Sequence, residues 1–339
     1  MEVSIFGRKD MQEILEMKEV IEGVKAVYKL KAEEETAVWP LVSYDFEEPA
    51  GVMDIKSGYI RGNINLHGAK MLNTFWGNDN VNTPIFNGLL MVFDSNTGVP
   101  LGMMDASYVT CMRTGAAGAI GVEVLARTDS RKLFILGAGK QASFQIAATL
   151  ILMPGIEKVY IADALSYENA VNFADRMPEV LRKDFKILNR EYVDFEAIED
   201  MAAGVGDSDV IITITPSRSP VIKKEWLKPG THLSCVGADM KGKVEIDPEI
   251  FTNAKIYADD KKQCMEVGEM ELAVKKGIIT EKKVVGEVGA VIAGLIPGRE
   301  TKDEITVFDA TGVALLDLVT AKIAIDLAKE KGLGRKAEI

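Results

Sequence analysis

Residues 132–142 read KLFILGAGKQA, an apolar run followed by two closely spaced glycines and a small residue. The run is typical of a buried strand, and residues 143–150 after the turn have a helical pattern. In a G-x-G-x-x-A turn, Gly137 permits the tight bend, Gly139 removes the Cβ that would block a pyrophosphate, and Ala142 keeps the helix near the sheet. The phosphates would lie on the free N–H groups that begin the helix. The stretch predicts a dinucleotide-binding Rossmann unit; the alternative is a plain α/β turn without a ligand.

Two further residues follow apolar runs where such a unit places its cofactor contacts. Asp163 comes directly after residues 158–162, where an acid would bind the hydroxyl groups of the adenosine ribose. A carboxylate there repels a 2′-phosphate, and residues 164–166 include no arginine, so we expect NAD rather than NADP. Residues 209–215 form another apolar run, and its last residue, Thr215, is expected beside the cofactor.

Short apolar runs alternate with helical patterns from residue 132 onward, which predicts an α/β fold with a doubly wound parallel sheet. Upstream, runs such as 70–76 and 88–94 predict a largely antiparallel sheet. We expect a last helix from Gly312 to about Lys331, followed by a frayed tail. The expected strands of the parallel sheet are residues 133–136, 159–162, 185–188, 210–214, 232–236 and 256–258. A further apolar run, residues 305–308, precedes the last helix.

The composition limits the classes of protein to which the chain can belong. Its 339 residues suggest two domains, and 47% hydrophobic residues suffice for a folded core. A formal net charge of -11 argues against nucleic acid as a partner, and no apolar run approaches the ~20 residues of a membrane span. Two histidines argue against a His-rich zinc site, so we expect no metal. Three cysteines without a CxxC pair, and an N-terminus without a signal peptide pattern, favour a cytoplasmic protein.

Ordered motifs over nearly the whole chain resemble the ornithine cyclodeaminase/μ-crystallin family, which also contains alanine dehydrogenases and imino-acid reductases. The matching stretches are residues 110–116, 137–142, 236–239 with 242–243, 298–299 and 305–312. The resemblance implies that residues 1–128 and 313–339 form an α+β domain for substrate binding and dimerisation. It implies that residues 129–312 form the dinucleotide-binding Rossmann domain, and that the chain is a homodimer.

The resemblance also implies roles for individual residues. Lys70 and Arg113 match the residues that bind a substrate carboxylate, and two cations in an acidic protein suit an α-amino or α-keto acid. Lys70 is also expected to take part in catalysis, and Asp239 matches the aspartate that transfers a proton at the substrate nitrogen. The expected cofactor-binding residues are Thr114, Gly137, Gly139, Lys140, Gln141, Ala142, Asp163 and Thr215.

Two departures from the family pattern affect the expected substrate. Residues 38–42 lack the arginine that usually follows a proline pair, and Arg61 is the candidate replacement. Residues 51–52 are Gly-Val, where cyclodeaminases carry an acid that holds the distal amine of a diamine. We therefore expect an NAD(P)-dependent oxidoreductase that reduces an imino or 2-oxo acid or oxidises an amino acid. The alternatives are a cyclodeaminase-type lyase, which uses NAD without net redox change, and a μ-crystallin-like binding protein.

Overall fold

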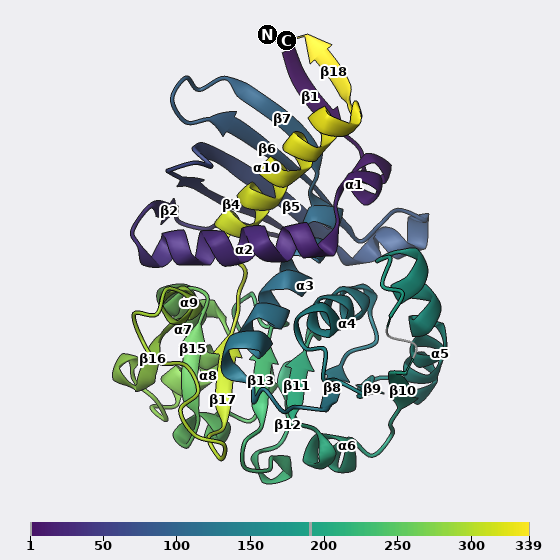
Figure 1. Ribbon diagram of the computed structural model, residues 1–339, viewed down its shortest axis with the longest axis vertical. Helices are drawn as coiled ribbons and strands as arrows, with labels where there is room; N and C mark the ends of the chain where they lie inside the picture. The colour runs from purple at the N-terminus through teal and green to yellow at the C-terminus, as the bar shows by residue number, and fades with distance from the viewer. Residues whose placement is uncertain (1, 190–191, 339) are drawn as a thin grey trace. The chain divides into compact units, whose positions relative to one another are not determined.

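The computed structural model describes residues 2–189 and 192–338, which divide into two compact units. The first unit comprises Met1–Arg113 and Val313–Ile339, and the second comprises Thr114–Gly312. Both chain ends thus lie in the first unit (Figure 1). None of the helices in the described ranges is both long and apolar enough to cross a membrane.

The first unit is built on an antiparallel sheet to which the N-terminal strand adds in parallel. Among the described residues this sheet has eight strands in the order β18-β1-β7-β6-β5-β4-β2, with β3 also paired to β4. The strands are β1 (Glu2–Phe6), β2 (Thr36–Val38), β3 (Val42–Phe46), β4 (Gly51–Ile60), β5 (Leu66–Phe75), β6 (Phe86–Asp94), β7 (Pro100–Asp105) and β18 (Arg335–Glu338). The helices are α1 (Arg8–Ile14), α2 (Met17–Ala32), the short 3-10 helix η1 (Trp76–Val81), α10 (Ala314–Lys331) and the first part of α3 (Ala106–Leu125).

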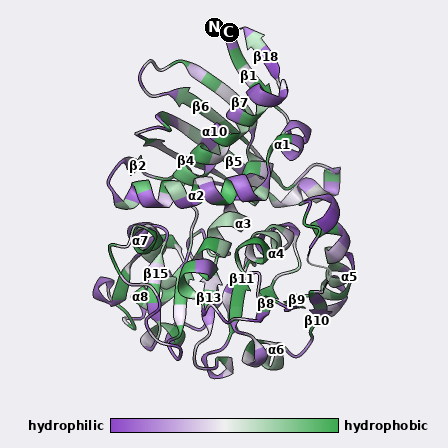
Figure 2. Ribbon diagram, viewed as in Figure 1, coloured by the Kyte–Doolittle hydropathy of each residue, from purple (hydrophilic) through white to green (hydrophobic). Residues whose placement is uncertain are grey.

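Helix α10 packs closely on one face of this sheet because glycines face it. A Cβ at Gly58 would lie 3.4 Å from Leu315, and a Cβ at Gly68 would lie 2.8 Å from Leu318. Residues on alternate positions of β4 and β5 therefore share the face that α10 covers. Helix α2 alternates hydrophobic and hydrophilic residues along its length, as expected of a helix with one buried face (Figure 2).

The second unit begins at Thr114, inside α3, whereas the sequence placed the domain boundary between residues 128 and 129. Glycines at every third position bring this part of the helix against its neighbours. A Cβ at Gly115 would lie 2.7 Å from the Phe144 carbonyl oxygen, and a Cβ at Gly121 would lie 2.2 Å from the Phe308 ring. A larger residue at Gly115 or Gly121 would collide with Phe144 or Phe308. The second half of α3 therefore packs closely with the second unit.

The second unit is built on a parallel sheet, which confirms the predicted α/β fold class. Its strands are β8 (Lys132–Leu136), β9 (Lys158–Ala162), β10 (Asp194–Ala197), β11 (Val210–Thr213), β13 (His232–Cys235), β15 (Lys255–Ala258), β16 (Val284–Glu287) and β17 (Thr306–Asp309). A separate parallel pair consists of β12 (Arg218–Ile222) and β14 (Val244–Ile246). The helices are α4 (Lys140–Leu152), α5 (Tyr167–Lys183), α6 (Met201–Asp207), α7 (Lys261–Val267), α8 (Met270–Lys275) and α9 (Val288–Ile292), with the 3-10 helices η2 (Lys224–Trp226), η3 (Pro248–Thr252) and η4 (Glu281–Lys283).

The order of these strands, β10-β9-β8-β11-β13-β17-β15-β16, reverses direction between β8 and β11. The chain winds outward from β8 through β9 to β10, then returns to β11 on the other side of β8. The central strands are coloured hydrophobic in Figure 2, as expected for a sheet buried on both faces. In such sheets, ligands bind outside the carboxyl ends of the strands at this switch point.

Two predictions about local structure are wrong. Residues 185–188 form no strand, because Lys186 has a left-handed φ of 55° and the Ile187 N–H bonds back to Leu181 at the end of α5. Strand β10 takes the place of this expected strand in the sheet. The tail is not frayed over its described length, because Arg335–Glu338 pairs antiparallel with β1.

Candidate functional site

The first unit gathers three buried, charged side chains at one point. Lys70 lies on β5, Arg113 on α3 and Asp317 on α10. The Lys70 Nζ atom lies 2.7 Å from each carboxylate oxygen of Asp317, and Arg113 Nε donates to Asp317 Oδ1 at 3.1 Å. The two cations predicted to bind one substrate carboxylate therefore meet at the carboxylate of a third residue.

Burial controls the charge of Lys70. Its side chain is fully buried, and this burial, together with the charges of Arg113 and Lys56, lowers the pKa of Lys70 to about 7 against the opposing effect of Asp317. Lys56, itself buried, lies directly opposite Lys70 on the neighbouring strand β4. The Lys70 ammonium also donates to Thr110 Oγ1 at 3.2 Å. A lysine with a pKa near 7 exchanges its proton at neutral pH, so it suits proton transfer as well as anion binding.

The sequence reasoning missed Asp317, although a signal was present. This acid stands within the apolar stretch ALLDLVTA at the start of α10 and is fully buried. Burial raises the pKa of a carboxyl group, but Lys70 and Arg113 outweigh that effect and hold the pKa of Asp317 below its ordinary value. An ionised residue within an otherwise apolar stretch of a helix must be paired with a buried cation. From the sequence, both candidate cations, Lys70 and Arg113, are assigned to the substrate instead.

In the second unit, the glycine-rich turn follows the carboxyl end of β8 and opens α4. Gly137 has φ 112°, a conformation that favours glycine, and a Cβ there would lie 3.1 Å from Thr215 Cγ2. Gly139 is different: its φ is -83°, and none of the described atoms of other segments lies within 4 Å of its ideal Cβ position. The fold itself therefore does not require glycine at this position, whereas a ligand approaching the backbone would require it.

The same region contains orphaned oxygen atoms. Thr114 Oγ1 and Gln141 Oε1 are buried and have no hydrogen-bond partner within the described ranges. Gln145 donates to the Thr114 carbonyl at 2.8 Å, which places Thr114 beside α4. Lys140 is exposed at the first position of that helix, and Ala142 is fully buried one residue after Gln141. Because buried polar atoms are normally paired, these oxygens fit a polar ligand such as a dinucleotide.

Asp163 and Thr215 lie on the two sides of the turn. Asp163 Oδ2 accepts the Ala138 N–H at 3.3 Å, and its Oδ1 accepts the N–H groups of Leu165 and Ser166 at 3.0 and 3.1 Å. Thr215 follows the neighbouring strand β11 and contacts Gly137 as described above. The switch point thus brings together Gly137, Asp163 and Thr215, three of the residues expected to hold the cofactor.

Asp239 follows strand β13 in the same unit, with its side chain 44% exposed. Lys243 Nζ donates to Asp239 Oδ1 at 2.6 Å, and the two side chains form an ion pair. A partly exposed carboxylate at the carboxyl edge of the sheet is accessible for proton exchange. Within the described residues, no group of three or more His, Cys, Asp or Glu side chains is arranged to hold a metal ion.

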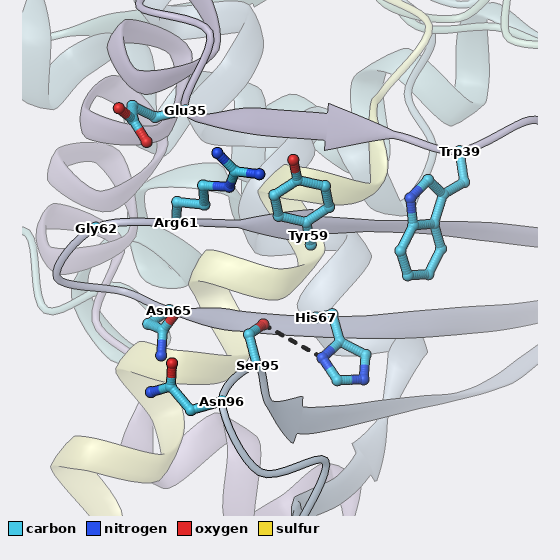
Figure 3. A pocket seen from close by; sticks show the side chains of 9 residues that line it. All are labelled: Glu35, Trp39, Tyr59, Arg61, Gly62, Asn65, His67, Ser95 and Asn96. Atoms are coloured by element: carbon cyan, nitrogen blue, oxygen red, sulfur yellow. Dashed lines mark hydrogen bonds between the residues drawn. The ribbon is translucent and has the colours of Figure 1, made fainter.

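Arg61 does not join Lys70 and Arg113. Its guanidinium lies over the Tyr59 ring, 5.3 Å from the centroid, and both residues line a separate pocket of about 690 Å³. Figure 3 shows Arg61, Tyr59, Trp39 and His67 in this pocket, with His67 hydrogen-bonded to Ser95. His67 and Lys70 are an odd number of positions apart on β5, so their side chains leave the sheet on opposite faces.

The chain is similar to known proteins in both sequence and structure. The model of the ornithine cyclodeaminase/mu-crystallin family matches residues 1–332. Alanine dehydrogenase of Archaeoglobus fulgidus is 35% identical over 337 residues, which cover 99% of this chain and 98% of that protein. The structure of an archaeal alanine dehydrogenase dimer with bound NAD matches with a TM-score of 0.91 and 34% identity, covering 100% of both chains. The structure of Thermococcus litoralis Δ1-pyrroline-2-carboxylate reductase with NADH and L-proline matches with a TM-score of 0.90 and 29% identity, covering 98% of this chain and 99% of that one. The chain therefore belongs to the ornithine cyclodeaminase/mu-crystallin family.

Proposed function

We propose that this chain is an NAD(H)-dependent oxidoreductase that interconverts an amino acid with the corresponding imino or 2-oxo acid. The observation that carries the proposal is the turn at the switch point, where Gly139 leaves its Cβ space open and Thr114 and Gln141 present unpartnered oxygens. Relatives over the whole chain length are a dehydrogenase and a reductase, and their structures hold NAD or NADH.

Residues of the second unit would hold the cofactor. The N–H groups of Lys140 and Gln141 at the start of α4 would bind the pyrophosphate, and Asp163 would accept hydrogen bonds from the adenosine ribose. Thr114 supplies a hydroxyl group, unpartnered among the described residues, beside this turn, and the methyl group of Thr215 lies against it. Bound NADH supplies a hydride for the carbon next to the substrate carboxylate, and NAD accepts one in the opposite direction.

The residues that the family resemblance singles out would act on the substrate. Lys70, Arg113 and Asp317 together carry a positive charge when Lys70 is protonated, which favours a carboxylate ligand. Donors that bind the carboxylate also polarise the adjacent C=N or C=O bond. We assign to Asp239 the transfer of a proton at the substrate nitrogen, because it is a partly exposed carboxylate at the carboxyl edge of the sheet.

The cyclodeaminase-type lyase is the less favoured function because the chain has no acid where such enzymes hold the distal amine. Gly51 stands there, and a Cβ at this position would lie 2.6 Å from the Phe75 ring. The fold therefore resists an acidic side chain at residue 51.

Parallel assays test the proposal. Imino acids, and 2-oxo acids with ammonia or methylamine, are incubated with stoichiometric NADH, while ornithine is incubated with catalytic NAD. We expect NADH consumption with at least one imino or 2-oxo acid, and a turnover number lower by ~10²–10⁴-fold in Asp239→Asn. Lys70→Ala should weaken substrate use far more than cofactor binding. Proline formation from ornithine, without NADH consumption on any imine, would overturn the proposal in favour of the lyase.

We also propose that the chain forms a homodimer through the first unit. Its sheet exposes large apolar side chains that a partner would cover, and the archaeal alanine dehydrogenase structure is a dimer. These side chains include Trp39, Tyr44, Met71, Leu89 and Met91. Light scattering of the purified protein tests the proposal, and a monomer at micromolar concentration would contradict it.

A further inference from the structure

Glu245 is a fully buried carboxylate that joins two loops at the carboxyl edge of the parallel sheet. Its Oε1 atom accepts the backbone N–H of Thr215 at 2.5 Å and the Thr215 hydroxyl at 2.8 Å. Its Oε2 atom accepts the backbone N–H of Gly237 at 3.1 Å. One side chain on β14 therefore satisfies donors from the loops that follow β11 and β13.

These two loops carry residues assigned to the reaction. Thr215 packs against Gly137 of the glycine-rich turn, and Asp239 lies two residues after Gly237. A shift of the Glu245 carboxylate would therefore move the wall of the cofactor turn and the loop of the proposed proton-transfer residue together.

The Glu245 carboxylate is packed tightly against the backbone at Gly237. A Cβ at Gly237 would lie 2.3 Å from Glu245 Oε2 and 2.5 Å from the Thr215 carbonyl oxygen, so residue 237 must be glycine for the loops to approach this closely. The strand that carries Glu245 is held in turn by Glu269, whose Oε1 accepts the N–H groups of Glu245 and Ile246 at 2.8 and 2.7 Å.

The pKa values of the two buried acids, Glu245 and Glu269, are shifted by their surroundings. Burial raises the pKa of both carboxyl groups; the N–H donors of Thr215 and Gly237 oppose the rise at Glu245, whereas Glu245 itself adds to the rise at Glu269. The pKa of Glu269 is raised further than that of Glu245, so Glu269 holds a proton more firmly than Glu245 does.

We propose that Glu245 is a positioning residue for this enzyme: by clamping Thr215 and Gly237, it sets the distance between the cofactor-binding turn and the loop that carries Asp239. The inference rests on the proposed function. It predicts that the charge and both oxygens of Glu245 matter for dinucleotide affinity and turnover, beyond any effect on folding.

Asp209 provides a matched control at the opposite end of the same strands. It stands immediately before β11, is also largely buried, and accepts the backbone N–H groups of Arg131 and Lys132 at 2.8 and 3.1 Å. Arg127 donates to its other oxygen at 2.7 Å. Asp209 thus braces the amino edge of β8 and β11 as Glu245 braces the carboxyl edge, but it touches none of the residues assigned to the cofactor or substrate.

The experiment compares Glu245→Gln with Asp209→Asn at a temperature where both variants are folded by circular dichroism. The Gln amide has a single acceptor oxygen, so its NH₂ group meets either the Thr215 donors or the Gly237 donor. We expect Glu245→Gln to raise the Kd for NADH about tenfold, measured by fluorescence titration, and to lower kcat by a similar factor. Asp209→Asn should lower the melting temperature while leaving Kd and kcat within about twofold.

A second variant keeps the inference testable if Glu245→Gln does not fold. Thr215→Val removes only the hydroxyl donor, and we expect it to raise the Kd for NADH; where Glu245→Gln folds, this loss should be smaller than that of Glu245→Gln and not additive with it. Unchanged Kd and kcat in folded Glu245→Gln, or in Thr215→Val where Glu245→Gln is unfolded, would overturn the inference. Equal losses in Asp209→Asn would also overturn it, because the effect would then be one of stability alone. Failure of the parent protein to bind NADH would instead refute the proposed function.

Discussion

The charge cluster of the first unit and the glycine-rich turn of the second present different kinds of chemical group. Lys70, Arg113 and Asp317 are side chains that come from three distant segments and are buried against one another. The turn at Gly137–Gly139 offers backbone N–H groups from one continuous stretch, and its decisive feature is an absent Cβ.

This difference has a physical consequence for stability and binding. Buried charges are costly unless they are paired. Removing one member of the cluster therefore leaves the others buried without a compensating charge. At Gly139, by contrast, none of the described atoms of other segments lies within 4 Å of the Cβ position, so packing does not require glycine there. Substitutions in the cluster should therefore change stability, whereas a substitution at Gly139 should change binding alone.

The largest expected effect is the loss of dinucleotide binding in Gly139→Val. The new side chain has room in the folded protein, since no described atom of another segment lies within 4 Å of the Cβ position, but it fills the space assigned to the pyrophosphate. NADH titration should show affinity lower by more than about 100-fold, with an unchanged melting temperature. Gly206→Val in α6, where the nearest atom lies 3.6 Å from the Cβ, is the control and should bind NADH normally. Normal affinity in Gly139→Val would remove the turn from the binding site.

The next effect is the destabilisation caused by Asp317→Asn. The substitution leaves Lys70 and Arg113 buried without their carboxylate, which typically costs about 3–5 kcal/mol. Asp326→Asn on the same helix breaks an ion pair with Lys322 in which the aspartate is 48% exposed, and should cost less than about 1 kcal/mol. Urea unfolding measures both. Equal free energies of unfolding for the two variants would show that the cluster is not the costly arrangement described above.

A smaller effect is the pH dependence that the lowered pKa of Lys70 imposes. In the folded protein Lys70 loses its proton near pH 7, so the cation that attracts a substrate carboxylate is present below that pH and disappears above it. Above the inflection, kcat/KM for reduction should fall about tenfold per pH unit. Lys70→Arg keeps the charge and should remove this inflection, whereas Lys56→Arg should retain it. If kcat/KM of Lys70→Arg shows the same inflection with pH, the inflection belongs to another titrating group.

The smallest expected effect concerns the choice between NAD and NADP. The Asp163 carboxylate accepts the Ala138 N–H at the edge of the turn, where its charge would repel a 2′-phosphate. Catalytic efficiency should be at least about tenfold higher with NADH than with NADPH. Asp163→Asn keeps an acceptor oxygen and removes the charge, so it should reduce the preference for NADH over NADPH. Comparable efficiencies in the parent enzyme would contradict this role.

The strands of the second unit could be predicted because their burial on both faces requires continuous apolar runs. Residues 133–136 and 159–162, for example, lie within β8 and β9. The same rule failed at residues 185–188, which are apolar in part but contain Lys186 with φ 55°. Strand β10 reads DFEA, so its pairing with β9 rather than its apolarity makes it a strand. The tail is similar, because Arg335–Glu338 becomes a strand only by pairing with β1.

What the sequence by itself determined was the turn at residues 137–142; through family resemblance it also predicted roles for Lys70, Arg113 and Asp239. A contiguous motif can be recognised because its geometry depends on neighbours in the chain. Only the tertiary structure decided that Asp317 pairs with Lys70 across 247 positions and that Glu245 spans the loops at Thr215 and Gly237. An acid in a helix or strand has no role that its neighbours in sequence reveal, because its charge is set by burial and by partners that folding brings to it.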